Sequence, residues 1–291
     1  MDIAATLPKV LNEIGDDTAI IDCKRITGGD INSAYYVKSA KRPYFVKVNE
    51  NIPPLFFKSE AVGLELLQKT NVVKVPKVYY VMEEKSGAYG LLLLEWIEGE
   101  KTNQTSMWLG QAVAKLHQCY GQHFGLAHDN YIGRLPQANG LYENWIDYFV
   151  NCRLLPQIQL AEQQSKMPIV RRQKLDKLLV SLDRWLPKLC RPSLLHGDLW
   201  GGNWIVGDKG IPYLIDPSVF YGHYEFEIAF TELFGGFPPL FYDAYNEIQP
   251  LSPEYKERKE LYQLYYLLVH LNLFGEAYGF SIDRILQKYV G

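Results

Sequence analysis

One short segment constrains the fold more than any other: a polar loop followed directly by a predicted hairpin. The loop has the sequence HGDLWGGN from His196 to Asn203, and two apolar leucines precede it. Residues 204–206 and 211–215 are predicted to form two short strands, with a glycine-containing turn at 207–210 between them. Because a hairpin brings its two ends together, Asn203 and Asp216, which flank it, are expected to lie close to each other.

The polar residues of this segment have the order and spacing of a phosphoryl-transfer centre. In an H-x-D-x-x-x-x-N loop the aspartate accepts the proton of the attacking hydroxyl group, and the asparagine and a later aspartate hold Mg²⁺ against the ATP phosphates. Carboxylate and amide oxygens are ligands that Mg²⁺ prefers. The spacing therefore predicts Asp198 as the catalytic base, Asn203 and Asp216 as metal ligands, and ATP and Mg²⁺ as cofactors. We expect His196 to brace this loop.

The composition excludes several other classes of protein. The chain has 291 residues, 47% of them hydrophobic, and a formal net charge of −3, which favours a globular protein and gives no electrostatic case for nucleic-acid binding. Its four cysteines show no C-x-x-C spacing. No apolar stretch is long enough for a membrane span, and no signal peptide is evident, so we expect a cytoplasmic protein. The oligomeric state stays open.

The pattern of apolar residues changes along the chain and predicts an α+β protein with two lobes. Residues 1–97 are expected to form a nucleotide-binding lobe, a small antiparallel sheet with one helix that begins near Pro53-Pro54. Residues 98–291 are expected to form a larger, mostly helical catalytic and substrate lobe. A hinge near residues 95–99 and a cleft between the lobes follow from this organisation. The expected strands are 23–27, 34–38, 44–48, 78–81 and 91–94, and the expected helices are 107–118, 145–160, 170–185 and 256–274.

Further residues are candidates for binding ATP. Lys47 lies inside the third predicted strand and Glu60 on the helix that follows, as in the lysine–glutamate pair that kinases present to the phosphates; Glu65 is the alternative to Glu60. No Walker A sequence occurs, which disfavours a P-loop enzyme. The turn before the second strand is expected to approach the phosphates, and main-chain groups at the end of the sheet lobe are expected to bind adenine. These positions are Gly28, Gly29, Asn32 and Ser33 for the turn, and Glu95, Trp96 and Ile97 for adenine.

The motifs resemble the fructosamine-3-kinase (ketosamine-3-kinase) family, in the aminoglycoside phosphotransferase and choline kinase branch of the protein-kinase-like fold. The resemblance rests on residues 27–31, 195–203 and 216–229 and covers nearly the whole chain. It implies a bilobal kinase fold and an enzyme that phosphorylates the C3 hydroxyl group of a ketosamine. The 3-phosphate then eliminates and frees the amine, which reverses glycation. Many relatives carry a cysteine where this chain has Asp30, so redox control through that turn is not expected here.

The substrate side is less constrained by the sequence. Trp200 is expected to contact the sugar or the carrier of the amine. Glu225 and Glu227 follow the expected metal site and are expected either to favour a cationic amine adduct or to brace the loop; for Glu227, predicted to be embedded in a helix, a structural role is favoured. We also expect a structural role for His117. The substrate is a small-molecule or protein-bound ketosamine. The alternatives are a kinase for another amino alcohol or an aminoglycoside, and a nucleotide-binding regulator without turnover.

Overall fold

The structure, a computed structural model, describes residues 3–26, 32–83 and 89–291, and its internal contacts divide the chain into two units. The sheet unit comprises Met1–Thr105 and Trp204–Pro217, and the helical unit comprises Ser106–Asn203 and Ser218–Gly291. In this division residues 98–105 and 204–217 belong with the sheet, whereas the sequence-based boundary at residue 97 assigned them to the other lobe. We describe each unit by itself.

The sheet unit is built on five antiparallel strands in the order β1-β2-β3-β5-β4. This confirms the predicted antiparallel sheet and its single following helix, while a further helix at the N-terminus was not anticipated. Short runs of alternating or β-branched apolar residues account for the strands. The elements are α1 (Ile3–Glu13), β1 (Ile20–Ile26), β2 (Ser33–Ser39), β3 (Pro43–Glu50), α2 (Phe56–Lys69), β4 (Val78–Glu83) and β5 (Tyr89–Glu95).

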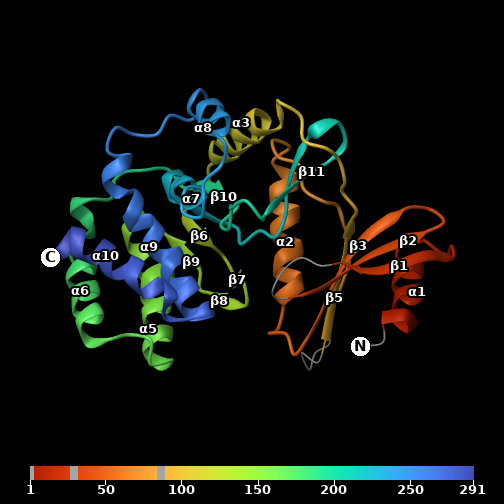
Figure 1. Cartoon of the computed structure of the whole chain (residues 1–291), viewed down its shortest axis with the longest axis horizontal. Coiled ribbons are helices and arrows are strands. Elements are labelled where there is room, and N and C mark those ends of the chain that lie inside the picture. The colour runs from red at the N-terminus through yellow and green to blue at the C-terminus, as the bar shows by residue number, and fades with distance from the viewer. Residues whose placement is uncertain (1–2, 27–31, 84–88) are drawn as a thin grey trace. The chain divides into compact units, whose positions relative to one another are not determined.

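The alternation of side chains along β3 places α1 and α2 on opposite faces of this sheet (Figure 1). Val46 and Val48 are buried in one apolar cluster with Leu7 and Val10 of α1. Lys47, between the two valines, points to the other face, where α2 lies. The same alternation that buries the valines therefore presents one lysine to α2.

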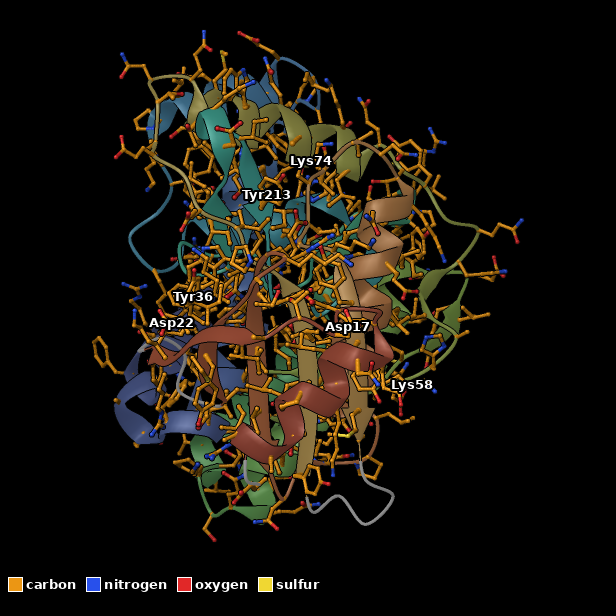
Figure 2. The ribbon with its side chains drawn as sticks, turned by 90° about the vertical axis from the view of Figure 1, so that its right-hand side faces the viewer. Asp17, Asp22, Tyr36, Lys58, Lys74 and Tyr213 are labelled. Atoms are coloured by element: carbon orange, nitrogen blue, oxygen red, sulfur yellow. The ribbon has the colours of Figure 1, made fainter. Side chains whose placement is uncertain are left out.

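The hairpin β11 (Trp204–Val206) and β12 (Pro212–Leu214) forms as predicted, with Trp204 opposite Leu214. It is anchored to the chain before β4, because the Leu214 N–H donates to the Lys74 carbonyl at 2.8 Å and Tyr213 bridges to Lys74 (Figure 2). A Cβ atom on Gly99 would lie 2.0 Å from the Gly207 carbonyl oxygen, so this close approach requires glycine.

The helical unit contains the helices expected from the sequence, but one of them is interrupted and the helix predicted over 170–185 ends at Leu179. The predicted helix 145–160 is divided into α4 (Trp145–Tyr148), a π-helical turn (Phe149–Leu154) and α5 (Leu155–Gln163). Pro156, in the first turn of α5, lacks an N–H group, so the regular hydrogen-bond ladder cannot continue through it. The other helices are α3 (Thr105–His117, which begins at the last residue of the sheet unit), α6 (Ile169–Leu179), α7 (Tyr224–Thr231), α8 (Pro239–Asn246), α9 (Tyr255–Phe274) and α10 (Gly279–Val290).

Short strands in the helical unit were not predicted. They form a four-stranded sheet in the order β10-β13-β6-β9 and a separate β7–β8 pair. Each has only three residues, too few to show a periodic pattern. They are β6 (Phe124–Leu126), β7 (Asn130–Ile132), β8 (Leu135–Gln137), β9 (Gly140–Tyr142), β10 (Ser193–Leu195) and β13 (Phe220–Gly222). Among the described helices of both units, none is long and apolar enough to cross a membrane.

Candidate functional site

In the sheet unit, Lys47 joins two carboxylates from distant parts of the chain. Its Nζ lies 2.7 Å from Glu60 Oε1 on α2 and 2.6 Å from Asp216 Oδ1 just after β12. Lys47 is only 4% exposed, so these carboxylates supply the counter-charge that water cannot. Glu65, the alternative to Glu60, is exposed. The structure thus pairs Lys47 with Glu60 and brings Asp216 to the same ammonium group.

The two carboxylates of this cluster stabilise the Lys47 cation. Burial alone would lower the pKa of the Lys47 ammonium group, but the carboxylates of Asp216 and Glu60 raise it above its usual value. Burial raises the pKa of the Glu60 carboxyl group, and the charge of Lys47 opposes that rise. Lys47 therefore remains a cation throughout the physiological pH range.

The backbone at Asp216 has an uncommon conformation. Its φ angle is 56°, in the left-handed region that few residues other than glycine adopt. Its side chain is 43% exposed, although one oxygen contacts Lys47. Left-handed residues of this kind cluster at functional sites, where the surrounding structure holds them. The conformation thus directs a partly exposed carboxylate toward Lys47.

The other nucleotide-binding candidates are described only in part. Gly28 and Gly29 lie outside the described residues. Asn32 accepts a hydrogen bond from Asn49 at 2.8 Å, and Ser33 accepts one from Arg25 at 3.3 Å, so both side chains belong to the network at the start of β2.

The predicted adenine-binding segment follows β5. Glu95 ends that strand, and its side chain accepts a hydrogen bond from the Lys77 amide. Trp96 packs edge-on against Tyr36, with 4.7 Å between the ring centroids. Ile97 comes next in the chain. The side chains of Glu95 and Trp96 are thus occupied locally, and adenine binding at this segment stays a prediction for its main-chain groups.

In the helical unit, Asp198 and Asn203 contact each other directly. The Asn203 side-chain amide donates to the Asp198 carbonyl oxygen at 2.8 Å and to Asp198 Oδ2 at 2.9 Å. Asn203 is 7% exposed and is therefore held in one orientation. With its NH₂ group committed to Asp198, the amide oxygen of Asn203 is the atom left for a cation. This donor set fits the hard-cation role predicted for Asn203.

A buried carboxylate from α7 holds the backbone of this loop. Glu227 has no exposed surface, and its two oxygens accept hydrogen bonds from the backbone N–H groups of His196 at 3.1 Å and Gly197 at 2.5 Å. Burial alone would raise the pKa of Glu227, but its hydrogen bond to His117 and the bond from the Gly197 amide contribute to lowering it. An ionised carboxylate thus fixes the two residues that precede Asp198.

Further side chains orient Glu227 and the loop. His117 Nε2 lies 2.9 Å from Glu227 Oε2, and His117 Nδ1 lies 2.7 Å from the Tyr245 hydroxyl oxygen. Since an ionised carboxylate only accepts, His117 Nε2 donates to Glu227. The Tyr266 hydroxyl group donates to the Gly197 carbonyl at 2.9 Å. The sequence predicted a structural role for His117, and for Glu227 a role that included bracing a loop, but it did not predict the contact between these two side chains.

Gly197 itself is required by the path of the backbone. Its φ angle is +85°, and a Cβ atom there would lie 2.0 Å from the Ser218 carbonyl oxygen. The Ser218 N–H in turn donates to the His196 carbonyl at 2.9 Å. Any side chain at position 197 would therefore push apart the segments that this hydrogen bond joins.

The two substrate candidates lie in different surroundings. Trp200 is 42% exposed, and its ring covers Gly202, where a Cβ atom would lie 2.4 Å from the ring. Glu225 has no exposed surface, and its carboxylate contacts Arg258 and the Ser252 amide rather than the loop 196–203. Trp200 is thus available to a ligand beside Asp198, whereas Glu225 belongs to another part of the helical unit.

The arrangement of elements identifies the fold of the protein. An aminoglycoside phosphotransferase of known structure has a TM-score of 0.64 to this chain and covers 99% of it and 100% of its own length, at 16% identity. That likeness shows the fold, which is protein-kinase-like and confirms the predicted α+β class.

More similar proteins define the family. The fructosamine kinase family matches residues 3–291, so the chain belongs to that family. A protein of Enterococcus faecium named a probable ketoamine kinase is 43% identical over 268 residues, which cover 91% of this chain and 94% of the relative. A structure from Haemophilus somnus 129PT, named as a fructosamine-3-kinase, is 31% identical with a TM-score of 0.86, covering 98% of this chain and 97% of the other.

Proposed function

We propose that this protein transfers the γ-phosphoryl group of ATP to the 3-hydroxyl group of a ketosamine, such as a fructosamine or ribulosamine adduct. Membership of the fructosamine kinase family supports this activity, and the ketoamine kinase relative supports the acceptor class. The observation that carries the proposal is the buried Lys47 ammonium group, held 2.7 Å from Glu60 and 2.6 Å from Asp216. Phosphoryl transfer depends mainly on such positioned charges.

We assign the nucleotide to residues of the sheet unit. Lys47, oriented by Glu60, binds phosphate oxygens. The turn with Gly28, Gly29, Asn32 and Ser33 covers the phosphates, and main-chain groups of Glu95, Trp96 and Ile97 bind adenine. Asn203 and Asp216, which flank the hairpin whose ends pair at Trp204 and Leu214, hold Mg²⁺. When bound, this ion neutralises charge on the phosphates of ATP.

Asp198 is the proposed base. Its carboxylate accepts the proton of the 3-hydroxyl group while that oxygen forms a bond to the γ-phosphorus, and the bond from phosphorus to the β–γ bridging oxygen breaks to release ADP. The bond from Asn203 keeps Asp198 Oδ2 in one orientation. Trp200 packs against the sugar or the amine carrier. The 3-phosphate product then eliminates and frees the amine, which deglycates a free or protein-bound amine, and we expect this to take place in the cytoplasm.

The experiment is a measurement of ADP release and of phosphate position. We expect a synthetic fructosyl-amine to support turnover and choline and kanamycin to support little, with ³¹P NMR placing the phosphate on O3. Asp198→Asn should lower kcat by about 10³-fold, within the range for general bases, and leave ATP affinity unchanged. Asp208→Asn, at an exposed position of the hairpin turn, is the matched control. Preference for kanamycin or choline, or full turnover by Asp198→Asn, would contradict the proposal.

A further inference from the structure

The helical unit contains a fully buried arginine, Arg153, in the π-helical turn Phe149–Leu154. Among the residues that the structure describes, no carboxylate forms an ion pair with it, and its hydrogen bonds go to carbonyl and amide oxygens. Removing a cation from water without a paired charge is costly, and apolar residues of similar size often stabilise a core at least as well. Stability alone therefore does not explain this arginine.

The guanidinium group holds the chain segment that follows β8. Arg153 Nη1 donates to the Ala138 carbonyl at 2.7 Å, and Nη2 donates to Asn139 Oδ1 at 3.0 Å. The Tyr148 hydroxyl group donates to the same Asn139 oxygen at 2.7 Å. Both contacts of the arginine come directly after Gln137, the last residue of β8. Because the guanidinium group is planar and rigid, two such bonds fix the position of this segment.

Gln137 connects that segment to residues 218 and 219. Its side chain is 2% exposed, and its Nε2 donates to the Ser218 carbonyl at 3.1 Å and to Asn130 Oδ1 at 2.8 Å. Its Oε1 accepts a hydrogen bond from the Tyr265 hydroxyl group at 2.7 Å. The Asn130 amide donates in turn to the Val219 carbonyl at 2.9 Å. With both amide hydrogens and the amide oxygen of Gln137 engaged, its side chain is held in one orientation.

The segment that Gln137 holds lies directly against the loop 196–203. The Ser218 N–H donates to the His196 carbonyl at 2.9 Å, and Phe220 pairs with Leu195 across β13 and β10. The ring of Phe220 also faces the arginine, whose central guanidinium carbon lies 4.0 Å from the ring centroid. A cation over an aromatic face is attracted to it. The arginine thus reaches the loop by two routes, one through amide side chains and one through an aromatic ring.

We propose that Arg153 is a positioning residue for phosphoryl transfer, because it fixes the segment 218–220 and, through it, the loop that presents Asp198 to the acceptor hydroxyl group. The effect on turnover rests on the function proposed above, whereas the effect on the loop does not. Arg153 has no exposed surface and so contacts no substrate. It acts on the reaction only through its neighbours. Glu227 holds the backbone of the same loop from α7, and Arg153 adds support at the segment paired with it.

The variant Arg153→Met removes the cation and its hydrogen bonds and keeps an unbranched side chain in the core. We expect kcat for the fructosyl-amine to fall by about tenfold, because a displaced base slows the transfer, while KM for ATP stays the same. Arg153→Lys keeps the charge but cannot bind both oxygens, so it should recover part of this loss. Arg284→Met, at an exposed position of α10, is the matched control. A loss of stability with unchanged kcat would show a merely structural role and overturn the proposal.

A double-mutant cycle with Gln137→Met tests the route through the amide side chains. Gln137→Met removes the donor to the Ser218 carbonyl, so it should lower kcat in the same way as Arg153→Met. Since Arg153 acts largely through Gln137, the double variant should lose clearly less than the product of the two single losses. Losses that multiply would show that the two side chains act independently and would refute this route.

Amide hydrogen exchange gives a readout that does not depend on turnover. In Arg153→Met, peptides that contain His196 and Ser218 should exchange about tenfold faster than in the unsubstituted protein, while peptides of α10 should not change. If Arg153→Met does not fold, Arg153→Lys and Gln137→Met are measured in the same way. An unsubstituted protein that fails to phosphorylate a fructosyl-amine would contradict the proposed function, yet the difference in exchange would still support positioning by Arg153. Unchanged exchange in all the folded variants would overturn the inference, whatever the turnover.

Discussion

The sheet unit and the helical unit hold their functional side chains by different means. In the sheet unit, Lys47 is held by direct contacts between opposite charges, one of them to the partly exposed Asp216. In the helical unit, the loop before Asp198 is held through its backbone by the fully buried Glu227. Contacts of the first kind can be exchanged for contacts with a charged ligand, whereas the second kind fixes a loop before any ligand binds. The sheet unit thus holds Lys47 by contacts that a charged ligand can replace, and the helical unit holds the loop before Asp198 in a fixed position.

The largest expected effect comes from removing the cation of the sheet unit. Lys47→Met leaves Glu60 and Asp216 without their counter-charge and takes away the proposed phosphate ligand, so we expect kcat/KM for ATP to fall by about 10³-fold or more. Breaking a fully buried pair costs about 3–5 kcal/mol, and because Asp216 is partly exposed we expect about 2 kcal/mol here, measured by urea unfolding.

Lys58→Met is the matched control, since Lys58 is an exposed lysine on α2. It should change neither quantity. The double variant with Lys47→Met and Glu60→Leu should be more stable than Lys47→Met alone, because it removes one unpaired carboxylate. It should not regain activity, because the cation is still missing. Normal turnover by Lys47→Met would refute the role given to this cluster.

The next effect tests the rigid loop of the helical unit. Glu227→Gln turns an acceptor of three hydrogen bonds into a group whose NH₂ faces other donors, so we expect a loss of about 2–3 kcal/mol of unfolding free energy. Turnover should fall by about tenfold or more, while ATP affinity stays the same, because Glu227 acts on Asp198 only through the backbone.

The control for this loop variant is Glu257→Gln, at an exposed position of α9. An equal fall in kcat for both variants would show that Glu227 does not position the loop. A pH profile of kcat adds a second readout, since a misplaced Asp198 should shift the acidic limb of the profile and a merely structural change should not.

A smaller effect separates the two units by their response to acid. Burial, with the charge of Arg258, lowers the pKa of His223 in the helical unit to about 3, from an ordinary value of 6.5. The unfolded chain therefore takes up this proton first as the pH falls below 6.5, so the stability from neutral His223 is complete above that pH and declines toward pH 3. Near pH 5 the loss should be about 2 kcal/mol, and His223→Gln should remove this part of the pH dependence.

In the sheet unit, the group whose ionisation makes stability depend on acid is Asp16. Burial alone would raise the pKa of its carboxyl group, but hydrogen bonds from Ser39, Thr18 and Tyr44 lower it well below the ordinary value of 3.8. The stability that Asp16 provides is thus complete above 3.8 and is lost as the pH falls below it. Asp16→Asn should therefore be less stable than the unsubstituted protein above about pH 4, and the difference should shrink as the pH falls below that value. A difference in stability that stays constant from pH 6 down into acid would contradict this assignment.

The smallest effect concerns Trp200. Because this side chain is 42% exposed and packs mainly over Gly202, Trp200→Ala should change stability by less than about 0.5 kcal/mol. It should raise KM for the fructosyl-amine by about fivefold, since a stacking contact of roughly 1 kcal/mol is lost. Trp200→Phe should restore most of the affinity. An unchanged KM in Trp200→Ala would leave this tryptophan without a role in substrate binding.

What could be predicted from the sequence differs between the two units. The five-stranded sheet, α2 and the hairpin β11–β12 follow from local alternation and turn residues. Kinase-like motif spacing paired Lys47 with Glu60 and Asn203 with Asp216, but the contact between Lys47 and Asp216 was not predicted. The contacts that hold the loop 196–203 could not be predicted in this way. Glu227 reaches His117, 110 residues away in sequence, and no local pattern specifies such a contact. The three-residue strands of the helical unit were missed for a related reason, since they exist only through pairing with one another.

The contact between Lys47 and Asp216 has a consequence for how ligands enter. A divalent ion that binds the Asp216 carboxylate has to displace the Lys47 ammonium group, which lies 2.6 Å away. A phosphate that binds Lys47 weakens the same ion pair. Each ligand thereby removes a group that competes with the other ligand. By reciprocal linkage, ion and nucleotide should bind with positive cooperativity, each raising the other's affinity by the same factor. Without the ion and the nucleotide, Lys47 serves as the counter-ion of Asp216.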